Sequence, residues 1–200
     1  MQTNRPVPIE NHAVATLTFI RASIESAGLF VVPGMAGIVM GIIGVLASVL
    51  ASVPSLLGNW LEIWLVAAVL AFALGGALIA RQATRSGQPR YFAPVKKFLL
   101  CLSPALMAGA VLTLTLWRVD MERLIPGVWL LLYGCAVLSA STVTSATITR
   151  LVSAMGCLFV LLGLIAFDLP PSGHALVLGI GFGALHVIFG ILIGHSTSGD

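Results

Sequence analysis

Three observations predict that this chain is an all-α integral membrane protein. Of its 200 residues, 58% are hydrophobic and only 8% are charged, and the mean hydropathy is +1.07. So few charged side chains would not cover the surface of a soluble protein of 20.8 kDa, whereas a surface that faces lipid needs none. The apolar runs are also continuous, without the alternation of apolar and polar residues that membrane β-strands show.

Six long uncharged stretches follow one another along the chain, and each is long enough for one helical span. A span needs about 20 mostly apolar residues. The predicted spans are residues 29–50, 61–80, 98–116, 126–141, 151–167 and 175–194. We expect the fourth helix to continue into the Ser/Thr-rich run at 139–149, where small hydroxyls can bond to their own helix. The six-helix membrane domain then covers 27–195, followed by a short tail at 196–200.

The segment that precedes the first span differs from the rest. Residues 1–10 hold two prolines and no apolar periodicity, which predicts a loose tail. From residue 11 to 26, apolar residues recur at helical spacing, at Ala13, Leu17, Ile20 and Ile24. We therefore expect an interfacial amphipathic helix that leads into the first span, with a partner-binding helix as the alternative.

The basic residues predict the orientation. Loops rich in Lys and Arg stay in the cytoplasm, and the connection after the second span carries Arg81, Arg85, Arg90, Lys96 and Lys97. With six spans, both termini share that side, and only Arg118 and Arg123 of the ten basic residues lie outside. The sequence thus predicts a multi-pass protein of the bacterial inner membrane with both termini cytoplasmic. The same five basic residues are expected to contact lipid headgroups, not nucleic acid.

The tryptophans agree with this orientation. They lie at the outer end of their predicted spans, at Trp60, Trp64, Trp117 and Trp129. Trp favours the membrane interface, where its ring meets apolar groups and its N–H reaches water or headgroups.

Glycine forms two helical stripes. The first contains Gly34, Gly37, Gly41 and Gly44, and the second contains Gly179, Gly183, Gly190 and Gly194. Spacings of three and four gather each set on one face of its helix, and small residues let helix backbones approach within lipid. Packing within the chain is the first interpretation of these stripes, and contact between copies in a homo-oligomer is the alternative.

The first and last pairs of predicted helices are similar to each other. In the first, two glycines seven residues apart are followed by Pro54 and then by Gly76-Ala-Leu-Ile-Ala-Arg81. In the last, Gly156 and Gly163 are followed by Pro170 and then by Gly190-Ile-Leu-Ile-Gly-His195. The sequence therefore predicts three hairpins, two of them related as a repeat in the same orientation.

These two segments, 34–81 and 155–195, resemble the glycine-rich hairpin of the HdeD family of small bacterial membrane proteins. The resemblance implies six spans, an association with acid stress and no enzymatic chemistry. The middle pair of helices departs from that pattern, and the resemblance carries no catalytic residue over to this chain.

His186 is the one ionisable side chain expected deep within a span. Ionisable groups inside membranes are costly and often functional. A hydrogen bond to Ser, Thr or Tyr133 across a helix interface is the structural interpretation, and haem ligation is the sharper alternative.

A second set of candidates lies on the outer side. It comprises Asp168, His174, Glu62, Asp120 and Glu122. Carboxylates near a His could sense external pH, because His titrates near about 6.5. Solvated loop charges explain the same residues.

No motif for catalysis is present. The sequence lacks Gly-x-x-x-x-Gly-Lys, His-Glu-x-x-His and Gly-x-Ser-x-Gly, and its three cysteines have neither metal nor redox spacing. We expect no enzyme, no cofactor and no metal site. The predicted function is that of a non-enzymatic structural or stress-adaptation protein, and the alternatives are a small transporter or channel subunit, or a membrane partner of a regulatory or cofactor-bearing protein.

Overall fold

Six helical segments in the structure are long and apolar enough to cross a membrane. The structure is a computed structural model that describes residues 16–17, 33–85 and 92–198. Within these residues the six segments are Gly34–Ala51, Pro54–Gln82, Val95–Arg118, Glu122–Ser141, Ile148–Asp168 and Pro171–Ser196. The prediction of an all-α protein with six candidate spans is confirmed. The interfacial helix predicted at 11–26 lies outside the described residues, except for Thr16 and Leu17.

The helices follow one another along the chain with short connections. Their bounds are α2 Gly34–Ala51, the 3-10 helix η1 Pro54–Asn59, α3 Trp60–Arg85, α4 Phe92–Arg118, the 3-10 helix η3 Glu122–Leu124, α5 Ile125–Ser141 and α6 Ala146–Asp168. The last span is made of α7 Pro171–Leu178, the π-helix η4 Gly179–Leu185 and α8 His186–Ser198. Prolines stand in the first turns of η1, α5 and α7, where a missing N–H costs no helical hydrogen bond.

The Ser/Thr-rich run at 139–149 contains a turn at residues 142–145, so the fourth helix does not continue through it. α5 ends at Ser141 and α6 begins at Ala146. The Thr144 hydroxyl donates to the Ser141 carbonyl at 2.7 Å, and the Ser153 hydroxyl donates to the Ser141 hydroxyl at 3.0 Å. The Thr144 hydroxyl thus satisfies a carbonyl that the helix end leaves open, and so it favours ending the helix there.

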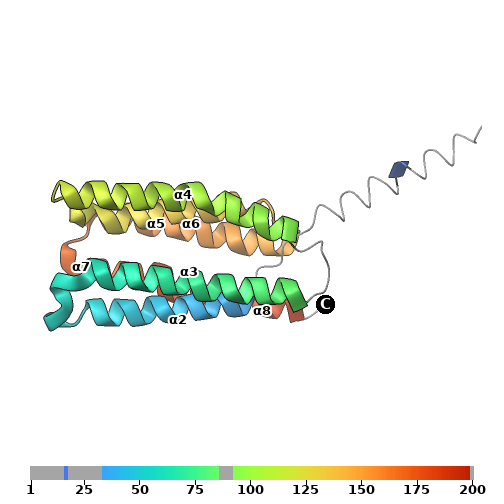
Figure 1. Ribbon diagram of the computed structural model, residues 1–200, viewed down its shortest axis with the longest axis horizontal. Helices are drawn as coiled ribbons and strands as arrows, with labels where there is room; N and C mark the ends of the chain where they lie inside the picture. The colour runs from blue at the N-terminus through green and yellow to red at the C-terminus, as the bar shows by residue number, and fades with distance from the viewer. Residues whose placement is uncertain (1–15, 18–32, 86–91, 199–200) are drawn as a thin grey trace, which may run out of the picture.

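The spans divide into two groups of helices (Figure 1). In the first, which we call the α2 group, α2 packs against α3, η4 and α8. In the second, the α4 group, α5 packs against both α4 and α6. We call the contacts between the two groups the seam. The last two spans therefore differ from the closed hairpin that the sequence predicted, because α6 packs mainly on α5 and α8 mainly on α2.

Glycine brings the helix backbones together within each group. In the α2 group, a Cβ atom added at Gly41 would lie 2.7 Å from the Gly183 carbonyl oxygen. In the α4 group, a Cβ added at Gly134 would lie 2.9 Å from the Gly156 carbonyl oxygen. Both distances are too short for a real side chain, so these helices pack backbone to backbone. The two glycine stripes face each other within the chain, and a second copy could not use the same surface.

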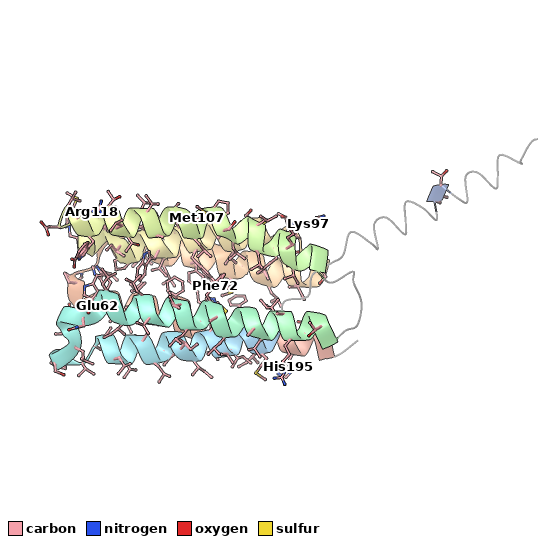
Figure 2. The ribbon with its side chains drawn as sticks, in the orientation of Figure 1. Glu62, Phe72, Lys97, Met107, Arg118 and His195 are labelled. Atoms are coloured by element: carbon pink, nitrogen blue, oxygen red, sulfur yellow. The ribbon has the colours of Figure 1, made fainter. Side chains whose placement is uncertain are left out.

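The charges lie at the two ends of the bundle (Figure 2). The end with the connections α2–α3, α4–α5 and α6–α7, which we call the acidic end, carries Glu62, Arg118, Asp120, Glu122, Arg123 and Asp168. The described charged side chains of the opposite, basic end are Arg81, Lys96, Lys97 and Arg150. Each helix therefore crosses the apolar layer without a charged side chain at mid-length.

The close approach of α2 to η4 and α8 predicts that one methyl group added at Gly41 destabilises the protein. We expect Gly41→Ala to lower the free energy of unfolding by about 1–3 kcal/mol, because the added Cβ overpacks a backbone contact. Gly76→Ala is the matched control, since a Cβ at Gly76 meets nothing within 4 Å. Both changes gain the same helix propensity, so thermal unfolding in detergent compares packing alone. Equal midpoints for the two variants would contradict the packing argument.

Candidate functional site

A hydrogen bond between Tyr133 and His186 joins the two helix groups at the seam. The Tyr133 hydroxyl on α5 lies 2.7 Å from Nε2 of His186 on α8. Nδ1 of His186 lies 3.4 Å from the Gly181 carbonyl oxygen, which makes a weak contact at most. A neutral imidazole protonated at Nδ1 satisfies both contacts, with Nε2 accepting a hydrogen bond from the Tyr133 hydroxyl. His186 is 4% exposed and Tyr133 is half-buried, so the imidazole is shielded from the surroundings.

Aromatic rings from three elements surround the polar pair. The Phe159 ring on α6 lies 4.8 Å from the Tyr133 ring and 5.5 Å from the His186 ring, between centroids. The Phe182 ring on η4 lies 5.2 Å from Tyr133 and is nearly parallel to His186 at 6.3 Å. Trp64 on α3 contacts Phe182 at 6.2 Å. Such apolar surroundings strengthen a hydrogen bond that is made and penalise one that is lost.

The π-helix explains how His186 faces the seam. In an α-helix, residues five apart differ in direction by about 140°. In a π-helix the hydrogen bonds join residues five apart, which places them on one face. Gly181 and His186 therefore both face the α4 group, and a Cβ at Gly181 would lie 2.5 Å from Leu130. Gly183 faces α2 instead, where its added Cβ would lie 2.8 Å from Val45.

Tryptophan makes a second seam contact, close to the acidic end. The rings of Trp60 on α3 and Trp129 on α5 lie 6.5 Å apart. The Trp129 indole N–H donates to the Thr113 hydroxyl at 2.7 Å, and that hydroxyl donates to the Gly109 carbonyl at 2.6 Å. Trp64 is 4% exposed, and its N–H has no partner among the described residues. Of the four tryptophans, Trp117 is largely exposed, Trp60 and Trp129 are half-buried, and Trp64 is buried. The interfacial role expected for all four stays a prediction.

No hydrogen bond or ion pair joins the outer titratable candidates, all of which are described residues. Glu62, Asp120 and Asp168 are exposed and Glu122 is half-buried. His174 is 7% exposed, and its Nε2 has no hydrogen-bond partner among the residues described. Within the described ranges, no group of three His, Cys, Asp or Glu residues could hold a metal ion. The coupling of His174 to a carboxylate stays a prediction.

The remaining candidates lie at the basic end and on the helix surfaces. Arg81, Lys96 and Lys97 are exposed where α3 ends and α4 begins. Arg85 is the last residue of α3, and Arg90 lies outside the described residues. All three cysteines are free, with Cys135 and Cys157 exposed.

Taken together, the spans, the charged ends and the apolar interior define a polytopic helical membrane protein. No protein-family model, no curated protein and no solved structure matches the chain. The comparisons therefore identify no family, and the resemblance to the HdeD family gains no support from them.

The sequence pointed to Tyr133 and His186 but not to the rings around them. Phe159 and Phe182 are aromatic residues in apolar spans that each hold a second Phe, and nothing in the sequence distinguishes them from lipid-facing residues. The signal that was present is Gly179-x-Gly-x-Gly183, because glycines two apart cannot share one face of an α-helix. That pattern indicates close contacts on two faces, which the π-helix makes.

The seam hydrogen bond predicts a measurable coupling between its two residues. We expect Tyr133→Phe to lower the free energy of unfolding by about 0.6 kcal/mol, the average for such bonds between membrane helices, and by no more than about 1.7 kcal/mol. In the His186→Phe background the same change should cost little, because no acceptor is left unpaired. A double-mutant cycle measured by unfolding in detergent gives the coupling, and strictly additive effects would refute it.

The π-helix predicts that the protein still folds when one residue of η4 is deleted. Removal of Ala184 leaves Gly181 and His186 four residues apart, a spacing that an ordinary α-helix places on one face. We expect this variant to fold and to keep the coupling to Tyr133. Removal of Ala108, an exposed alanine in α4, is the control and should destabilise the protein, because it rotates one end of α4 by about 100°. Loss of the Tyr133 coupling in the Ala184 deletion would contradict this account.

Proposed function

We propose that the protein is a non-enzymatic structural component of the bacterial inner membrane, with its basic end in the cytoplasm. The observation that carries this proposal is the packing of the interior. Glycine lets helix backbones touch within each group, and the polar pair at the seam bonds to itself. Such an interior favours a protein that acts through its shape and its surface.

The arrangement of polar groups argues against catalysis. A nucleophile needs a base within hydrogen-bond reach. His186 is the one described imidazole near mid-span, and it contacts a phenol hydroxyl and a backbone carbonyl. The serine and threonine hydroxyls at the α5–α6 turn are bonded to helix carbonyls. These groups stabilise the fold and leave no activated nucleophile among the described residues.

A role in acid stress is part of this proposal and rests on the HdeD resemblance alone. Its test is a deletion strain compared with the parent after transfer to acid medium and after envelope stress. Unchanged survival under both conditions removes the stress-adaptation role and leaves a structural protein of another purpose.

A small carrier is the second candidate, and one observation favours it. Many carriers move substrate by rocking one helix bundle against another around a central site. Here two helix groups meet at a seam that contains a π-helix, an element that often marks functional sites. Against it, ion-coupled carriers depend on ionised groups at depth, and every described Asp, Glu, Lys and Arg lies at a helix end or in a connection.

Reconstitution distinguishes the two functions. We expect liposomes that contain the protein to show no proton, Na⁺ or K⁺ flux above that of empty liposomes. His186→Phe and Tyr133→Phe should behave as the wild type does, because neither residue lines a pathway in the structural proposal. A flux that wild type shows and His186→Phe lacks would overturn the structural proposal in favour of the carrier.

A further inference from the structure

α4 presents a long apolar strip away from the rest of the protein. Its buried residues, Leu102, Gly109 and Thr113, face α5. On the opposite side are Leu100, Met107, Val111 and Leu114, with exposed fractions of 57%, 70%, 64% and 47%. They continue the helical spacing that starts at Lys96, which is also exposed. We call these five residues the α4 strip.

The strip begins at an end of the bundle that is uniformly basic in its described part. Lys96 and Lys97 are exposed at the start of α4, and Figure 2 shows Lys97 at the end opposite to Glu62 and Arg118. The four described acidic residues all lie at the other end. The start of the strip therefore attracts anions, while the rest of it is apolar.

We propose that an anionic phospholipid binds along the α4 strip. Lys96 and Lys97 hold its phosphate, and one acyl chain lies along Leu100 and Met107. Lysine suits this position because its stem can lie along apolar surface while its ammonium donates three hydrogen bonds to the headgroup.

The dimensions of the strip fit one leaflet. A helix rises about 1.5 Å per residue, so residues 97 to 107 cover about 15 Å. Half of a hydrocarbon core of about 30 Å is also about 15 Å. A chain whose headgroup sits at Lys96 and Lys97 thus reaches the bilayer midplane near Met107, which is the middle of the span Val95–Arg118.

A second copy of the protein fits this surface less well. A closed dimer in a membrane places the same ends of both copies side by side, and the lysines of two α4 strips would then face each other. Helix contacts in membranes also favour small residues, as the glycine contacts of α2 with α8 show. The strip has large side chains instead, which suit a flexible acyl chain.

Native mass spectrometry of the full chain in neutral detergent tests the proposal. The protein is titrated with dioleoyl phosphatidylglycerol and, separately, with dioleoyl phosphatidylcholine. We expect preferential retention of phosphatidylglycerol. A basic residue near anionic lipid contributes about fivefold in affinity, so Lys96→Gln with Lys97→Gln should reduce the preference by up to about 25-fold. Arg118→Gln with Arg123→Gln removes the same charge at the acidic end and should leave the preference unchanged.

A second pair of variants tests the acyl chain. Leu100→Ser with Met107→Ser should weaken retention of both lipids and keep the preference for phosphatidylglycerol, since the lysines remain. These side chains are exposed, so the thermal midpoint of the protein reports that it stays folded. Equal retention of the two lipids by wild type overturns the proposal. So does an equal loss in the acidic-end control, or a protein dimer that the Leu100/Met107 variant dissociates. None of these outcomes depends on whether the protein carries out transport.

Discussion

The structure depends on helix backbones approaching more closely than any side chain permits. In lipid, apolar side chains gain nothing by leaving their surroundings, so packing must come from close van der Waals contact. Gly41 meets the backbone at Gly183, and Gly134 meets the backbone at Gly156. The first contact joins α2 to η4, which are far apart in the sequence, and the second joins α5 to α6, which follow one another. They join the helices into two groups, and this division decides which side chains meet at the seam.

The seam between the groups is built on a different principle. Large rings fill most of it, with Gly181 as the close contact, and Tyr133 packs against all three clusters of buried apolar residues. The hydrogen bond to His186 therefore lies where the two groups share a residue. The helix that carries His186 must satisfy α2 on one side and α5 with α6 on the other. An α-helix that runs straight through would turn one of these faces away, and the π-helix removes the conflict by adding a residue between Gly181 and His186.

The sequence predicted most of what depends on one helix at a time. The number of spans follows from uncharged stretches, and the glycine stripes follow from a spacing along one chain segment. The sequence predicted less well which helices pack against each other. The similar glycine patterns of 34–81 and 155–195 suggested equivalent hairpins, yet α6 packs on α5 because Gly127 and Gly163 supply a matching surface there. The tryptophans show the same limit of sequence-based prediction. Trp64 and Trp129 lie at the start of their helices, as interfacial residues do, but Trp64 is buried and Trp129 donates its N–H to Thr113. The stop at Ser141 is a local effect of hydroxyl groups, which compete with the helix for its own carbonyls.

The scarcity of charge has two consequences that point in the same direction. Inside the bundle it leaves Tyr133 and His186 to satisfy each other, because no carboxylate or guanidinium among the described residues lies near mid-span. The acidic end mixes both signs, whereas the described part of the basic end has no acid to neutralise Arg81, Lys96, Lys97 and Arg150. Charges of one sign attract anions most strongly where no opposite charge neutralises them. The surface of the protein, and not its core, is therefore where anionic molecules bind in preference to neutral ones.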